Sequence, residues 1–400
     1  MCLWIFEKKI KESRFYSNLH LYDMEKPKLC WVTADYFTDC DLKPELLKRV
    51  SEVYSIHWIV VFFHGGNRYH ESDFDTVRRM GGDIQVEFFH IKHRHRDLRF
   101  WGDYRNLRKK ILSYSPDLVY LNISVGEVHT VPLVYHMPSE KTIITAHQGR
   151  VHEGMKRKQL CKLFRWLVYR RLRNVNMFSE SQMQFFKETF PQSRVFLNHL
   201  GLKEFGNPTI ERDMKAEKVR FLSFGIINYA KNIDLLIDAA ESLYDEGEHG
   251  FVVSINGGCS NWQFYDDRIH HPELFENDIR LIPNEDIPNL FTQSHFFVQP
   301  YRVVSQSGPL KIAYRYHTPV IVSDLPGFTD EVTEGVSGFI FEHENIESLK
   351  LVLRKAIKCY RTDYDRLIYS MTEYVHENYS EEKLAETYLQ MFNTVIKDEK

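Results

Sequence analysis

The chain has 400 residues, 43% of them hydrophobic and 27% charged, which is enough apolar material for two domains of ordinary size. Its formal net charge of −3 argues against a protein whose main partner is nucleic acid. The six cysteines are scattered and form no C-x-x-C pair, so we expect a reducing compartment rather than a zinc site or a disulfide framework. No apolar run approaches the roughly 20 residues that a helix needs to cross a bilayer, and the chain is expected to be cytoplasmic.

The first half of the chain contains short apolar runs separated by helical or irregular segments. The candidate strands are residues 28–34, 57–63, 84–89, 117–123, 141–146, 176–181 and 194–201. Strands that alternate with helices indicate a parallel sheet covered on both faces. Residues 1–205 are therefore predicted to form a Rossmann-like domain. The polar segment 201–218 contains Gly206 and Pro208 and is predicted to link this domain to the next.

The second half follows the same plan more clearly. Its candidate strands are residues 219–224, 251–255, 279–282, 295–301, 319–323 and 338–342. Amphipathic helices are predicted between them, the longest after residues 232 and 344. We expect an α/β protein of two Rossmann-like parallel-sheet domains, the second spanning residues 206–375.

Two loops of the second half have residues suited to an anion. Gly225 to Lys231, "GIINYAK", combines a glycine that lets backbone approach closely with a lysine charge. Ser305, Gln306, Ser307 and Gly308 precede a predicted helix, and small residues there leave the positive end of the helix dipole uncovered. In open parallel sheets ligands bind beyond the carboxyl ends of the strands, where both loops would lie. Together they favour a diphosphate ligand, although a solvated lysine and a simple helix cap remain the ordinary alternatives.

Other nucleotide-binding patterns are missing from the sequence. Neither half opens with G-x-G-x-x-G, which argues against a dinucleotide-binding domain, and no G-x-x-x-x-G-K-[ST] stretch is present. A P-loop NTPase is therefore excluded.

At this point the residues resemble a known family. The segments "FLSFGIINYAKNIDLLIDAA", "IPNEDIPNLFTQSHFFVQPY" and "SQSGPLKIAYRYHTPVIVSDLPGFTDEVTEGVSGFIF" are similar to GT-B glycosyltransferases of family 4, as are "FSES" and "LNHLG". The resemblance implies two facing Rossmann-like domains, a nucleotide-sugar donor, transfer with retention and no metal or other cofactor. It also implies that residues 1–205 form the acceptor side, and that residues 376–400 form a terminal helix returning to the first domain.

The resemblance also assigns individual residues. Lys231 would bind the donor diphosphate, Gly225 would lie in the same loop, and residues 305–308 would form the phosphate-facing helix start. Glu331, in "LPGFTDE", resembles the acidic residue of the family's "GG-x-x-E" stretch. His147, in "ITAHQG", falls where many members have a catalytic-site histidine near donor phosphate and acceptor. Glu180, in "FSES", fits a structural turn beside the cleft.

The sequence departs from the family pattern at specific positions. The usual pair of glutamates would fall on Val304 and Ile312, and the arginine that often follows the first glycine is Ile226. These departures keep one alternative open, a catalytically weakened protein that binds a nucleotide-sugar or a partner enzyme as a scaffold. A further alternative is a sugar-nucleotide epimerase, which would need acid/base carboxylates of its own in the cleft, and the spacing assigns no such set. The leading hypothesis is a glycosyltransferase that assembles a surface polysaccharide or glycolipid.

The basic segment 156–174, "KRKQLCKLFRWLVYRRLRN", has two interpretations. Its apolar residues at helical spacing, among them Leu160 and Leu163, fit a helix that packs on the core with a solvated basic face. The same pattern fits a peripheral contact with anionic lipid at the inner face of a membrane, where a lipid-linked acceptor would be presented.

Overall fold

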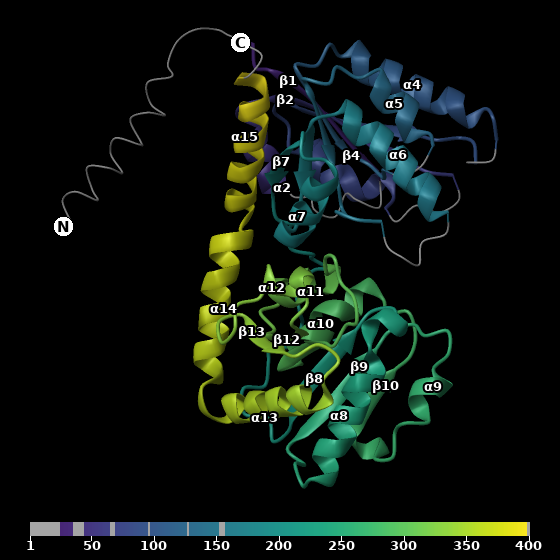
Figure 1. Cartoon of the computed structure of the whole chain (residues 1–400). Coiled ribbons are helices and arrows are strands. Elements are labelled where there is room, and N and C mark those ends of the chain that lie inside the picture. Colours follow the sequence, from purple (N-terminus) through teal and green to yellow (C-terminus); the bar gives the residue numbers. More distant parts are fainter. Residues whose placement is uncertain are drawn as a thin grey trace, which may run out of the picture.

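The computed structural model describes residues 25–34, 44–64, 69–94, 97–125, 128–151 and 157–397. It contains two parallel sheets, one of seven strands and one of six. Each sheet is covered by helices on both faces (Figure 1). The predicted class, α/β with two Rossmann-like domains, is confirmed.

The first domain is built on the seven-stranded sheet, in the order β3-β2-β1-β4-β5-β6-β7. Its strands are β1 (Lys28–Ala34), β2 (Ser55–Phe62), β3 (Ile84–His90), β4 (Leu118–Asn122), β5 (Thr142–Thr145), β6 (Asn174–Met177) and β7 (Arg194–Leu197). Strands β1, β2 and β4 are buried along almost their whole length, as expected of a central strand with both faces covered. This explains their continuous apolar sequences.

Helices of the first domain divide between the two faces of its sheet. One face carries α4 (Phe100–Ser113), α5 (Thr130–Tyr135), α6 (Lys158–Arg171) and α7 (Glu180–Thr189). The other carries α2 (Pro44–Ser51), the 3-10 helix η2 (Glu71–Phe74) and α3 (Asp75–Arg79). The second face is completed by a helix from the far end of the chain, described below.

The second domain is built on the six-stranded sheet, in the order β10-β9-β8-β11-β12-β13. Its strands are β8 (Val219–Phe224), β9 (Phe251–Asn256), β10 (Phe275–Asp278), β11 (Phe296–Gln299), β12 (Val320–Ser323) and β13 (Gly338–Phe341). Helices α8 (Ile233–Asp245) and α13 (Ile346–Thr362) cover one face, and α10 (Ile287–Thr292), α11 (Gly308–Arg315) and α12 (Pro326–Thr329) cover the other. The shorter elements are η3 (Tyr229–Lys231), α9 (Gln263–Asp266), η4 (Pro272–Leu274) and η5 (Asn284–Asp286).

Two consecutive helices connect the domains at the end of the chain. Helix α14 (Tyr364–Tyr379) packs on the second domain, and α15 (Glu381–Lys397) runs along the first (Figure 1). Tyr388 of α15 stacks on Trp31 of β1 at a ring-centroid distance of 5.3 Å, and the Tyr54 hydroxyl donates to Asn393 at 2.7 Å. The last helix is thus part of the first domain's core.

Two predicted strands differ from the structure. Residues 279–282 are not a strand: β10 ends at Asp278, and the apolar run continues past the edge of the sheet, with Leu281 81% exposed. The strand predicted at 176–181 is β6, which ends at Met177, because Ser179 accepts a hydrogen bond from the Gln182 amide and so begins helix α7.

The segment predicted as a linker is held against the second domain. Residues 201–218 form neither helix nor strand, and β8 begins directly after them. The Arg212 guanidinium donates to the carbonyl oxygens of Tyr316 at 3.1 Å and His317 at 2.6 Å, and the Phe205 amide donates to the Tyr316 hydroxyl at 2.9 Å. The linker is therefore positioned by the end of α11.

Candidate functional site

A pocket of about 240 Å³ lies at the carboxyl ends of the second domain's strands. Loops after β8, β9 and β10 and the start of α11 converge on it, which is where parallel sheets bind ligands. It is lined by Lys203, Phe205, Phe224, Gly225, Ile226, Gly257, Gly258, Leu281, Ile282, Asn284, Ile287, Gly308, Pro309 and Ile312. Two predicted donor-binding residues, Gly225 and Gly308, therefore border one pocket.

Two glycines allow the loops after β8 and β9 to touch. Gly225 has φ +116° and Gly257 has φ +150°, both in the region that side chains disfavour. A Cβ atom on Gly257 would collide with the carbonyl oxygen of Gly225. Ile226 and Leu281 line the pocket beside these glycines, and 66% and 81% of their surfaces are exposed. These apolar side chains offer a surface on which a flat ring can pack.

The start of helix α11 lies beside a cation that sequence reasoning missed. Ser307 is the N-cap residue, and its hydroxyl oxygen accepts from the Leu310 amide at 3.3 Å. A Cβ atom on Gly308 would lie only 3.1 Å from the Lys203 ammonium, so the glycine lets this lysine approach the helix start. Lys203 comes from the linker, and its position in the sequence gave no signal of this role.

A chain of hydrogen bonds joins the two predicted phosphate-binding loops. The Lys231 ammonium donates to the Tyr301 hydroxyl oxygen and lies 3.8 Å from the centre of that ring. The Gln299 amide donates to the same hydroxyl at 2.9 Å and to the Ser307 hydroxyl at 2.7 Å. Lys231 and Ser307 are thus brought together through two residues at the end of β11, neither of which was predicted as a site residue.

Burial lowers the pKa of Lys231 from 10.5 to about 8. None of the ion pairs formed among the described residues involves Lys231, so its charge is not neutralised by a neighbouring carboxylate there. A half-buried ammonium of this kind gains most from an anionic ligand, because the ligand restores the electrostatic stabilisation that burial removed.

The loop before α11 also contains an unsatisfied donor. The side-chain amide nitrogen of Gln306, Nε2, is buried and has no hydrogen-bond partner within the described part of the chain. The neighbouring Ser305 packs under Gly327, where a Cβ atom would lie 3.1 Å from the Ser305 carbonyl group. Buried donors are normally paired. The unpaired side-chain amide of Gln306 can therefore donate to an oxygen of a ligand.

Glu331 lies beneath the site. Its carboxylate forms an ion pair with Lys311 of α11, and the two side chains are 4% and 0% exposed. Its carbonyl oxygen accepts from the hydroxyls of Tyr314 at 2.6 Å and Tyr374 at 2.7 Å. The structure places this carboxylate within the core that supports α11, and its predicted role in donor binding remains a prediction.

His147 follows β5 at the carboxyl end of the first sheet. Its Nε2 donates to the Asn122 side-chain oxygen at 2.9 Å, and its ring lies 5.4 Å from that of Phe178. Burial lowers the pKa of His147 to about 4, so the imidazole is neutral at pH 7, with the proton on Nε2. The structure does not bring His147 into contact with the loops around Lys231; it lies on the other domain.

The two domains meet next to His147. Asp330 of the second domain accepts hydrogen bonds at one carboxylate oxygen from the Ser179 hydroxyl at 2.8 Å, the Ser181 amide at 2.9 Å and the Ser181 hydroxyl at 2.8 Å. These serines form the start of helix α7, whose dipole favours a negative charge. The segment "FSES", predicted to be a turn beside the cleft, thus contacts the second domain, and Glu180 itself is exposed.

The described residues contain neither a candidate metal site nor a candidate membrane-spanning helix. No group of three or more His, Cys, Asp or Glu side chains in the described ranges is arranged to hold a metal ion. Within the same ranges, no helix has both the length and the apolar character needed to cross a membrane.

Known proteins were compared with the chain. Residues 210–373 match the family model described as glycosyl transferases group 1, and no curated protein gives a significant match. A glycosyltransferase from Rickettsia africae has a TM-score of 0.70 at 13% identity, covering 94% of this chain and 100% of that one. HepE from Anabaena, in complex with UDP and glucose, has a TM-score of 0.64 at 13% identity, with coverage of 92% and 100%.

A third similar structure is a TarM variant from S. aureus, in complex with fondaparinux, α-GlcNAc-glycerol and UDP. Its TM-score is 0.62 at 12% identity, and the alignment covers 92% of this chain and 100% of that one. At such identities these structures establish the fold alone, and the family model matches most of the second domain. The chain therefore has the GT-B fold, and residues 210–373 of it match the glycosyl transferases group 1 model.

Proposed function

We propose that the protein transfers a sugar, with retention, from a nucleotide-sugar to a glycan or glycolipid acceptor, without a metal or other cofactor. One observation carries the proposal: Tyr301 and Gln299 link the half-buried Lys231 to Ser307 at the start of α11. A lysine and a helix start on adjoining loops suit the two phosphates of a nucleoside diphosphate. The UDP named in the complexes of HepE and TarM supports this class of donor.

The pocket beside these loops is assigned to the nucleoside. Ile226 and Leu281 expose apolar surface there, and Gly225, Gly257 and Gly258 line the same pocket. A nucleoside has both a flat apolar face and polar edges. The diphosphate would then extend towards Lys203, Lys231 and the Gln306 amide.

The chemistry assigned to this chain is electrostatic. The sugar–phosphate bond of the donor breaks while the acceptor oxygen bonds to the same sugar carbon, and the acceptor proton passes to the departing phosphate oxygen. Lys231 and the start of α11 stabilise the negative charge that develops on the diphosphate. Neutral His147, with Asn122 holding its Nε2 proton, accepts a hydrogen bond at Nδ1 and orients the acceptor or phosphate.

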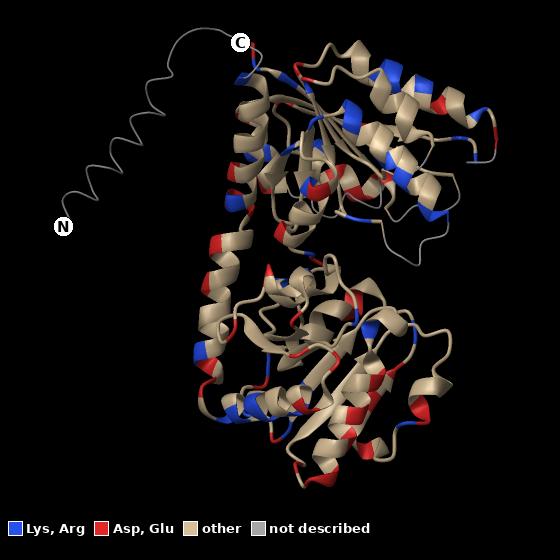
Figure 2. Cartoon of the chain, in the orientation of Figure 1, with Lys and Arg blue, Asp and Glu red and all other residues tan. Residues whose placement is uncertain are grey.

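The acceptor is assigned to the first domain, at the inner face of a membrane. Helix α6 exposes Leu160, Leu163 and Trp166, by 47%, 48% and 43%, so part of the apolar stripe faces outwards rather than the core. Lys and Arg residues occur along the same helix (Figure 2). Apolar and aromatic side chains among cations suit an anionic lipid surface. Leu163→Glu with Trp166→Glu should abolish cosedimentation with anionic vesicles, and unchanged sedimentation would refute this contact.

The donor site is tested by calorimetric titration of UDP, GDP and ADP into the wild type, Lys231→Ala and Lys203→Ala. One nucleotide should bind, and each variant should weaken it at least about tenfold, because each removes a charge-assisted contact with phosphate. Lys215→Ala is the matched control, since Lys215 is an exposed cation of the linker that does not line the pocket.

Activity with labelled donors separates the possible functions. Transfer to an acceptor, with the anomeric configuration of the product retained, supports the proposed reaction. Binding without transfer or hydrolysis would favour the scaffold alternative, and interconversion of nucleotide-sugars without acceptor would favour an epimerase. No binding of any of the three nucleotides would overturn the donor site itself.

A further inference from the structure

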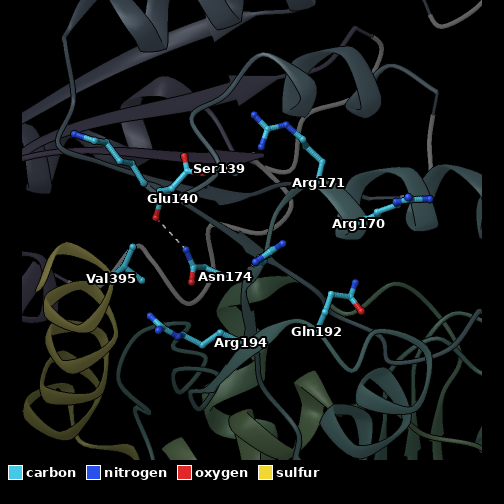
Figure 3. A pocket seen from close by; sticks show the side chains of 10 residues that line it. Ser139, Glu140, Arg170, Arg171, Asn174, Gln192, Arg194 and Val395 are labelled. Carbon is cyan, nitrogen blue, oxygen red and sulfur yellow. Dashed lines mark hydrogen bonds between the residues drawn. The ribbon is translucent and has the colours of Figure 1, made fainter. Parts of the chain in front are cut away.

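A second, larger pocket lies in the first domain, at the opposite ends of its strands from His147. Its volume is about 980 Å³, within the range of ligand-binding cavities. The starts of β5, β6 and β7, the end of α6 and the end of α15 surround it (Figure 3). Its lining residues are Ser139, Glu140, Lys141, Arg170, Arg171, Arg173, Asn174, Gln192, Arg194 and Val395.

The charge of this pocket is strongly unbalanced. Five of its lining residues are Lys or Arg and one, Glu140, is acidic. A hydrogen bond from Ser139, helped by Arg171 and Arg173, lowers the pKa of Glu140, which therefore stays charged and offsets a single cation. Within the described ranges, no ion pair involves Arg170, Arg171 or Arg173. Arg171 donates to the Met137 carbonyl oxygen at 3.1 Å.

The cations come from different elements, so the fold of the domain, and not the repeat of one helix, brings them together. Arg170 and Arg171 end α6, Lys141 and Arg173 immediately precede β5 and β6, and Arg194 begins β7 (Figure 3). A hydrogen bond from the Asn174 amide to the Glu140 carbonyl oxygen, 3.1 Å long, ties two of these strand starts together. Like charges repel, and a concave surface concentrates their field, so the arrangement gains most from a multivalent anion.

We propose that this pocket is a binding site for a ligand carrying two or more phosphate groups. Arginine guanidinium groups match phosphate oxygens in a bidentate way, and three of them line the pocket within four residues of one another in sequence. Neighbouring headgroups of an anionic lipid surface and a free polyphosphate both present several phosphates in this way. Arg170 also lies over the Trp166 ring, 4.9 Å from its centre, which makes the pocket continuous with the exposed apolar face of α6.

The test uses full-length protein carrying Lys231→Ala and Lys203→Ala, so that anion binding at the donor loops is weakened. Inorganic pyrophosphate is titrated into this protein and into the same protein with Arg170→Gln and Arg173→Gln. Both arginines are exposed, so the substitutions should leave the thermal unfolding midpoint unchanged. The matched control carries Lys215→Gln and Lys218→Gln, two exposed cations of the linker. Binding should weaken at least about tenfold in the arginine variant and not in the control.

A second arm distinguishes the two sources of phosphate. Sedimentation is measured with phosphatidylcholine vesicles, with and without phosphatidylglycerol. If the arginine variant loses both pyrophosphate and anionic vesicles, the ligand is a lipid headgroup; if it loses pyrophosphate alone, the ligand is a free phosphate compound. Equal pyrophosphate affinity in the arginine and control variants would overturn the site, whatever the fate of the donor-site proposal.

Discussion

Lys231 is the residue whose environment says most about ligand binding. Its pKa of about 8 in the free protein lies below the value that a bound diphosphate would produce, because an adjacent anion favours the charged form. Ligand binding should therefore take up a proton near and above pH 8. Nucleotide affinity should stay level below pH 8 and fall by up to about tenfold per pH unit above it.

Calorimetry at pH 8 in two buffers with different ionisation enthalpies measures this proton uptake directly. The apparent enthalpies should differ for the wild type and coincide for Lys231→Met, which keeps the length of the side chain but cannot be protonated. Equal enthalpies for the wild type would show that Lys231 does not sense the ligand's charge.

Helix α11 is the element on which the proposed donor site depends. The buried ion pair between Lys311 of this helix and Glu331 stabilises the position of the helix. Removing one partner of a buried ion pair leaves an uncompensated charge and costs about 3–5 kcal/mol. Glu331→Gln should therefore lower the free energy of unfolding by roughly that amount. Lys311→Met combined with Glu331→Leu should recover most of the loss, since both charges are then absent.

Urea unfolding of the single and double variants checks this, with nucleotide titration beside it. If the double variant regains stability and still binds nucleotide, Glu331 supports α11 without contacting the donor. If it regains stability but loses the nucleotide, the predicted donor-binding role of Glu331 is supported.

The elements also show what could be predicted from the sequence. Central strands such as β1 and β8 were predictable because burial on both faces imposes a continuous apolar run. The same reasoning was wrong for residues 279–282, where Leu281 is apolar yet exposed at the pocket. Lys203 and Tyr301 escaped prediction because their contacts with Gly308 and Lys231 span 105 and 70 positions of the chain, which no local pattern encodes.

At the scale of the whole molecule, Asp330 connects the domains. Its carboxylate accepts three hydrogen bonds from Ser179 and Ser181 at the start of α7. Charge-assisted hydrogen bonds of this kind contribute about 1.5–3 kcal/mol, enough to change the balance between domain arrangements. Asp330→Asn should shift the molecule towards more open arrangements and increase its radius of gyration in small-angle X-ray scattering.

Asp324→Asn provides the control for this experiment. Asp324 is a carboxylate of the same domain, and it accepts from the His343 amide at 2.8 Å, a contact that lies within the second domain. An Asp330→Asn variant with the same scattering profile as the control would show that the contact does not set the domain arrangement.

The position of α15 has a consequence for the order in which the protein is made. The ribosome synthesises the first domain before the second, yet that domain's core includes Leu384, Tyr388 and Phe392 from the last helix. The second domain's residues are complete by α14, so it can fold while α15 is still being synthesised. The half that emerges first is thus finished after the second, and emergence of α15 from the ribosome is the event that allows Trp31 to meet Tyr388.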